Sequence, residues 1–142
     1  MGMLEELGTY LVGATGIGTL GTDVFLHTMP ETSRATLSLF EAPGLGPQYA
    51  YGGTAPTFHR AQVDLVARST AAPNGAVNPT ATRTRLARAW NRLTAVTNST
   101  LSGRGYLRVE PTDEPHLIDR DEQGRYVFGC SFTVMRRGST AL

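Results

Sequence analysis

Apolar residues recur at helical spacing in two segments of the chain, residues 3–12 and 80–97. In the first segment, Leu4, Leu7 and Leu11 fall at positions i, i+3 and i+7, and a glycine follows the last turn. In the second segment the apolar stripe consists of Leu86, Trp90, Leu93 and Val96. The pattern therefore predicts a short N-terminal helix and one long helix in the second half.

Apolar and polar residues alternate in most of the remaining chain, which is the pattern of a half-buried strand. The alternating or apolar segments are 24–27, 34–40, 57–68, 106–109, 116–119 and 125–136. In the last one, the residues expected to face the core are Tyr126, Phe128, Cys130, Phe132 and Val134. We expect a mostly antiparallel sheet with both helices packed on one face. The predicted fold class is α+β, with the element order α-β-β-β-α-β-β-β.

Length and composition limit what this fold can be. A chain of 142 residues is the usual size of one domain, so we expect a single domain over 1–142. A net charge of +1 argues against DNA binding through bulk charge. The single cysteine, Cys130, lies in an apolar strand pattern and is expected to be a buried small hydrophobe. No run approaches the roughly 18 apolar residues of a membrane span, so we expect a soluble, unexported protein.

Several features invite a chemical interpretation, beginning with the glycine-rich segment 12–18. Glycine loops cradle phosphates where a strand leads into a helix. This segment instead follows a predicted helix and leads into a predicted strand, and no Gly-Lys-Ser/Thr follows it. We interpret it as a flexible connector.

The three histidines, His27, His59 and His116, lie in or beside different predicted strands. None has a partner at metal-ligand spacing, and no serine elbow is present. The sequence therefore predicts no catalytic residue, no metal and no cofactor. A small enzyme that uses His59 or His116 beside a carboxylate stays an alternative, and a deep pocket holding such a pair would support it.

Charged and aromatic residues outside the predicted core are candidates for contact with partners. A predicted hairpin carries Asp119, Asp121, Glu122 and Arg125, and the long helix carries Arg85, Arg88 and Arg92. Tyr49 and Tyr51 lie in the Gly/Pro-rich loop 42–56, which we expect to become ordered on contact with a partner. A solvated surface is the simpler interpretation of these charges, and docking is the alternative. Under the docking interpretation, the acidic hairpin of one copy meets the helix arginines of the next.

The C-terminal half resembles a known family. The residues that carry the resemblance are Tyr106-Leu-Arg-Val-Glu-Pro, Pro115-His-Leu-Ile-Asp-Arg-Asp-Glu-Gln-Gly-Arg125 and Val127-Phe-Gly-Cys-Ser-Phe-Thr-Val134. They are similar to the tail terminator and minor capsid (neck) proteins of long-tailed bacteriophages, with Asp121, Gly124 and Arg125 matching the family's turn. The resemblance covers residues 80–136 in this way, and the N-terminal half by pattern alone.

This resemblance implies a non-enzymatic virion protein without a cofactor. Such proteins form a ring, usually hexameric, that caps the tail tube and offers a surface to the head–tail connector. DNA passes through the ring without specific binding, no membrane is involved, and assembly takes place in the host cytoplasm. The alternatives are a head-completion or connector protein of the same neck, and a small binding module unrelated to phage.

Overall fold

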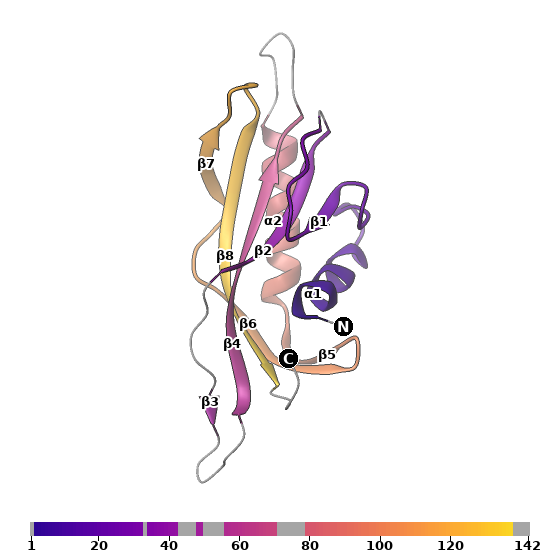
Figure 1. The fold of residues 1–142 in the computed structure, drawn as a ribbon, viewed down its shortest axis with the longest axis vertical. Coiled ribbons are helices and arrows are strands. Elements are labelled where there is room, and N and C mark those ends of the chain that lie inside the picture. The colour runs from indigo at the N-terminus through magenta and orange to yellow at the C-terminus, as the bar shows by residue number, and fades with distance from the viewer. Residues whose placement is uncertain (1, 33, 43–47, 50–55, 71–78, 138–142) are drawn as a thin grey trace.

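The computed structural model describes residues 2–32, 34–42, 48–49, 56–70 and 79–137. Two long antiparallel strands, β4 (Pro56–Arg68) and β8 (Tyr126–Arg137), form the centre of an eight-stranded sheet. β2 (Thr36–Ala42) and β3 (Gln48–Tyr49) pair with β4, whereas β6 (Arg104–Pro111) and β7 (His116–Arg120) pair with β8. β1 (Val24–Leu26) continues the sheet beyond β2, and β5 (Thr97–Leu101) continues it beyond β6. The molecule is consequently elongated along its two central strands (Figure 1).

Two helices cover one face of this sheet. α2 (Thr80–Thr94) packs on β4, β6 and β8, and α1 (Met3–Val12) packs on β1, β2 and α2. The side chains between these layers are almost fully buried, and they include Leu4, Leu7, Leu11, Leu37, Leu39, Val63, Leu65, Leu86, Leu93, Phe132 and Val134. The helices and alternating strands thus bury the apolar positions that their sequence patterns indicate. None of the helices in the described part of the chain is long and apolar enough to span a membrane.

The predicted α+β class is confirmed, but the element order needs two more strands. β3 lies within the predicted loop 42–56, and β5 follows α2 where the pattern predicts the end of the long helix. That helix ends at Thr94, so Val96 is buried outside it. The sheet is mixed, because β1 runs parallel to β2 while the other ladders between described strands are antiparallel.

β5 is missed because it carries almost no apolar signal. Its sequence is Thr-Asn-Ser-Thr-Leu, and only Leu101 is buried. A tight turn at Ser102 and Gly103, both with positive φ (49° and 83°), joins it to β6. Two positive φ values in succession are typical of the turn that matches the twist of a two-stranded ribbon. Turn geometry rather than hydrophobicity therefore defines this hairpin.

The strand β2 is buried on both sides, in contrast to the half-buried strand that alternation predicts. Leu37 and Leu39 face the helices, and Thr36 and Ser38 on the other side are equally inaccessible. Arg68, which lies opposite Thr36 in the neighbouring strand, is 4% exposed. The sheet face opposite the helices is thus inaccessible to solvent around Thr36, Ser38 and Arg68.

A buried polar cluster links α1 to β6 and to the C-terminal end of β8. The hydroxyl of Tyr106 donates to Glu6 Oε1 at 2.6 Å, and Arg136 Nη2 lies 3.0 Å from the same oxygen. All three residues are 5% exposed or less. Burial and the neighbouring Glu6 carboxylate raise the pKa of Tyr106, so its hydroxyl stays protonated as a donor. The cluster fixes α1 against β6 and β8.

Candidate subunit interface

The helix arginines that the sequence suggests for docking are used within the chain. Arg85 donates from Nε to the carbonyl of Ile17 at 2.5 Å and from Nη2 to the carbonyl of Asp23 at 3.0 Å. Arg92 donates from Nε and Nη2 to the carbonyl of Tyr10, at 3.1 and 2.9 Å, and its guanidinium stacks 4.0 Å above the Tyr10 ring. These contacts connect α2 to α1 and to the segment that follows it.

The glycine-rich segment is held in place by the same arginines, which corrects the prediction of a flexible connector. Ile17 is 1% exposed in the core. Gly16 and Gly18 have φ values of 85° and 141°, and a Cβ on either would lie 2.6 Å from Arg88 Nη1 or Arg85 Nη2, respectively. The glycines are required because guanidinium groups pack directly on their backbone. We call the contacts of Arg85, Arg88 and Arg92 with residues 10–23 the arginine clamp.

The acidic turn is likewise tied to its own chain. Asp121 Oδ2 accepts from Arg125 Nε at 2.6 Å, and its Oδ1 accepts from the backbone amides of Gln123 and Arg125. Desolvation alone raises the pKa of Asp121, but the hydrogen bonds from Arg125 outweigh it and place this pKa below its usual value. Asp121 is therefore an ionised structural partner of Arg125.

Arg125 connects this turn to the segment that precedes β2. Its side chain is 4% exposed, and it donates to the carbonyl of Thr32 at 2.9 Å and to the carboxylate of Glu31 at 3.1 Å. Arg68, also buried, donates to the carbonyl of Pro30 at 2.5 Å and lies 3.8 Å from Glu31. Burial and the nearby Arg125 lower the pKa of Arg68. Arg68 and Arg125 thus hold the segment that precedes β2 against β4 and β8 through hydrogen bonds and ion pairs.

Among the residues whose side chains the structure describes, the acidic turn and the helix arginines make their contacts separately, each within its own part of the chain. Asp119 and Glu122 are exposed, and Asp119 Oδ1 accepts from the backbone amide of Arg120 at 2.7 Å. Tyr49 belongs to the short strand β3, but its side chain and all of Tyr51 lie outside the described residues. An interface role for any of these residues stays a prediction.

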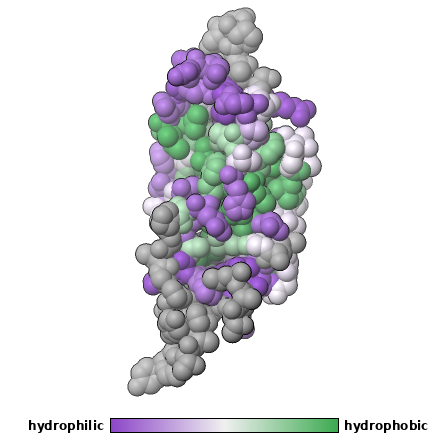
Figure 2. Space-filling model, in the orientation of Figure 1, coloured by the Kyte–Doolittle hydropathy of each residue, from purple (hydrophilic) through white to green (hydrophobic). Residues whose placement is uncertain are grey.

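A surface that the sequence analysis does not single out lies on β7. All five of its residues are exposed, and Leu117 and Ile118 are the exposed large hydrophobic side chains of the described chain, at 53% and 55%. Ile118 packs against the backbone of Gly129 in β8. Figure 2 shows the resulting hydrophobic area, with hydrophilic side chains above it. The signal in the sequence is an adjacent Leu-Ile pair with carboxylates on both sides.

β7 has a strand partner on one side only. It pairs with β8 through residues 116–120, with a register shift after Leu117, and no other described strand adjoins it. An edge of this kind exposes backbone N–H and C=O groups that can pair with another strand. We call β7, which contains Asp119, together with the nearby acidic residues Asp113, Glu114 and Glu122 the acidic edge.

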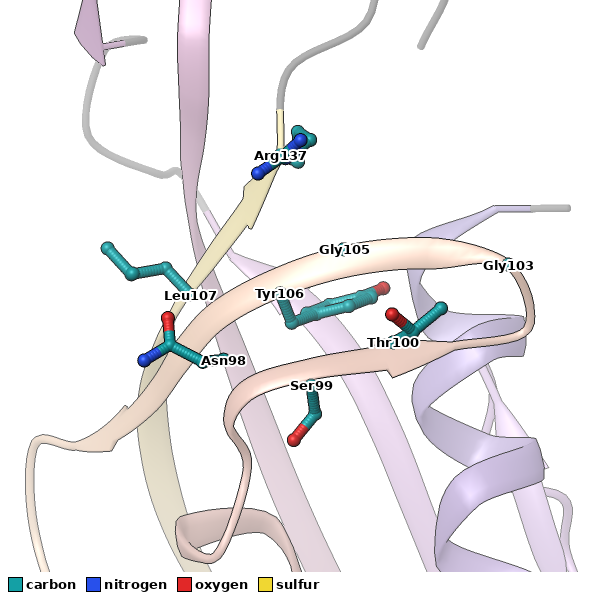
Figure 3. A pocket seen from close by; sticks show the side chains of 8 residues that line it. All are labelled: Asn98, Ser99, Thr100, Gly103, Gly105, Tyr106, Leu107 and Arg137. Carbon is teal, nitrogen blue, oxygen red and sulfur yellow. The ribbon is translucent and has the colours of Figure 1, made fainter.

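A second feature is an open depression of about 420 Å³ at the opposite end of β8. It is lined by Asn98, Ser99, Thr100, Gly103, Gly105, Tyr106, Leu107 and Arg137. Figure 3 shows that these residues come from the β5–β6 hairpin and from the end of β8. Arg104 and Arg108 lie on the same hairpin, where Arg108 pairs with Glu110 at 3.5 Å, so basic residues outnumber acidic ones around the depression. We call this surface the basic hairpin.

A second, smaller depression of about 180 Å³ tests the enzymatic alternative. Its lining includes Asp64, Asp113, His116 and Ser131. His116 Nδ1 lies 3.9 Å from Asp113, but the hydroxyl of Ser131 donates to Asp64 at 2.7 Å rather than to the histidine. A serine nucleophile must be bonded to its base, so this arrangement is not a triad.

Cys130 and a metal site are two further candidates for chemistry. Burial raises the pKa of Cys130 to about 12, which leaves the thiol protonated and inert at neutral pH. Among the described residues, no group of three or more His, Cys, Asp or Glu side chains is placed to hold a metal ion. Arg85, Arg92 and Arg125, in contrast, are bound within their own chain and hold the fold together.

Sequence comparison places this protein in a family. The family model described as bacteriophage tail terminator protein matches residues 11–136, and the chain belongs to this family. No curated protein shows significant similarity to the chain. The match includes the N-terminal half, which the resemblance in the sequence covers by pattern alone. The protein is thus a structural component of a bacteriophage tail.

Proposed function

We propose that this protein forms a closed ring of six copies that caps the finished tail tube and joins it to the head–tail connector. The family match over residues 11–136 carries the proposal, because a tail terminator acts where the tube ends. The ring stops further addition of tube subunits and leaves a lumen through which DNA passes. The mechanism is geometric and needs no cofactor or chemical step.

The subunit has features that suit ring formation. A ring of identical subunits is closed by heterologous contacts, in which one patch binds a different patch on the next copy. The acidic edge and the basic hairpin are two different patches at opposite ends of β8. Internal charge pairs, such as Glu6 with Arg136 and Asp121 with Arg125, keep the subunit rigid between them.

Electron microscopy of the purified protein, alone and mixed with tail tubes, tests this function. We expect rings of uniform diameter in the free protein at high concentration, and one ring at the end of each tube. Tubes assembled in its presence should have uniform length. A protein that stays monomeric at every concentration and never binds tube ends would contradict the proposal.

A further inference from the structure

We infer that the acidic edge of one copy docks on the basic hairpin of the next copy, with β7 lying along the outer side of β5. This inference rests on the proposed ring and names the two surfaces that close it. The occupant of each surface is therefore a second copy of this chain.

The first argument is the pairing capacity of the two strands. β7 and β5 each span five residues, and among the described strands each pairs with one only, β7 with β8 and β5 with β6. An exposed edge is satisfied when an extended segment of another chain adds to it through main-chain hydrogen bonds. Pairing β7 with β5 of the neighbour would satisfy both edges in one contact.

The second argument is the apolar surface that β7 exposes. Leu117 and Ile118 are each more than half exposed, which is unfavourable for two adjacent large aliphatic residues in water. The depression beside β5 has Tyr106 and Leu107 in its lining and is large enough to receive an aliphatic side chain.

The third argument is charge. Asp119 lies in β7 with Asp113, Glu114 and Glu122 close to it in the chain, whereas Arg104 and Arg108 lie in β6 and Arg137 ends β8. Arg108 also pairs with Glu110 of its own strand at 3.5 Å, so Arg104 and Arg137 carry most of the charge argument. Complementary charges steer association and set the register of an interface. The arginines of α2, in contrast, are bound to carbonyl groups of their own chain. We therefore expect the acidic residues to pair with the basic hairpin of the next copy, and not with the arginines of α2.

The fourth argument is placement. β7 pairs with residues 126–129 of β8, and β6, which carries β5, pairs with residues 132–136. Figure 1 shows β7 at the upper left and β5 at the lower right of the elongated molecule. The two surfaces therefore point in different directions, as successive heterologous contacts around a ring require.

A charge-swap experiment on the full chain tests the inference. Asp119→Arg and Arg137→Glu each reverse one exposed charge, and Glu41→Arg and Arg34→Glu are matched controls at exposed positions outside both surfaces. Ring assembly is measured by analytical ultracentrifugation and electron microscopy, and folding is checked by circular dichroism. We expect each interface variant to raise the concentration for half-assembly at least tenfold, while the controls assemble like the wild type.

Recombining the two changes makes the test specific. The double variant Asp119→Arg/Arg137→Glu, and a one-to-one mixture of the single variants, should both restore rings, because opposite charges again face each other. Rings that persist in both single variants would overturn the inference but leave the ring function standing. Single variants that form rings but no longer bind tube ends would also overturn the inference and leave the ring function standing, because β7 would then contact the tube protein. Loss without any rescue would show that the two surfaces do not meet, and a monomeric wild type would overturn both proposals.

Discussion

The arginine clamp and the acidic edge are both clusters of charged residues in the sequence, but only the clamp finds its binding partners within the chain. In the clamp, Arg85 and Arg92 donate to carbonyl groups of the same chain, and glycines give their guanidinium groups room. At the acidic edge, Leu117 and Ile118 are exposed and β7 has one strand neighbour among the described residues. The comparison teaches that a charged or apolar pattern indicates an interface only when the fold leaves it unsatisfied.

The largest effect on stability is expected inside the polar cluster beneath α1. Glu6→Ala removes the carboxylate that accepts from Tyr106 and pairs with the buried Arg136. Breaking a buried ion pair from one side costs about 3–5 kcal/mol, so the free energy of unfolding should fall by about that amount. Urea denaturation measures it, with Glu5→Ala as the control, because Glu5 is exposed in the same helical turn. Equal effects of the two substitutions would show that the cluster is not what holds α1.

The glycines of the clamp come next. At Gly18 a Cβ would lie 2.6 Å from both Arg85 Nη2 and Asp23 Oδ1, whereas at Gly21 nothing lies within 4 Å. Both have positive φ, 141° at Gly18 and 83° at Gly21, so both substitutions with alanine carry a backbone penalty of about 1–3 kcal/mol. Gly18→Ala should lose about 2 kcal/mol more than Gly21→Ala, because the clamp must also move. Thermal unfolding compares them, and identical losses would mean that the arginines do not pack on this backbone.

The turn that precedes β8 should give a smaller, pH-dependent effect. The pKa of Asp121 is depressed in the folded state, so its contribution is complete above the ordinary carboxyl pKa of about 3.9 and is lost as pH falls through the folded value. At pH 7, Asp121→Asn should lower the free energy of unfolding by about 1 kcal/mol. This difference from the wild type should shrink as the pH is lowered below about 4. A difference that is the same at pH 7 and at pH 3 would argue against the ionised pair with Arg125.

The smallest effect on stability belongs to the acidic edge. Leu117→Ser changes a side chain that is half exposed, so the unfolding free energy of the dilute protein should change by no more than about 0.5 kcal/mol. The same substitution should weaken ring assembly, since it removes apolar area from the proposed contact. Sedimentation at increasing concentration separates the two quantities. A large loss of stability without any change in assembly would place Leu117 in the fold rather than in the interface.

The sequence predicts the parts of this fold that depend on hydrophobic period. The stripe of α2 and the core face of β8 bury most of the residues that their spacing indicates, such as Leu86 and Phe132. Trp90 is the exception in the stripe, because it is only partly buried and its indole N–H donates to the carbonyl of Asp113 at 3.0 Å. Period alone cannot identify such a contact between distant segments.

The parts that the sequence does not predict depend on which elements meet in space. The glycine-rich segment is taken for a flexible connector because the arginines that hold it lie about 70 residues away along the chain. β5 is missed because polar strands have no period that distinguishes them from a loop. The exposure of Leu117 and Ile118 follows from the position of β7 beside β8 alone, which no local pattern encodes.

Hydrogen exchange measured on the wild-type protein tests most directly whether copies meet through β7 and β5. Amide exchange is compared between dilute monomer and concentrated ring, and the peptides that matter cover residues 116–120 and 97–101. We predict slower exchange in both peptides on ring formation and unchanged exchange in the arginine clamp over residues 10–23. Rings that form while residues 116–120 and 97–101 exchange as fast as in the monomer would contradict the account.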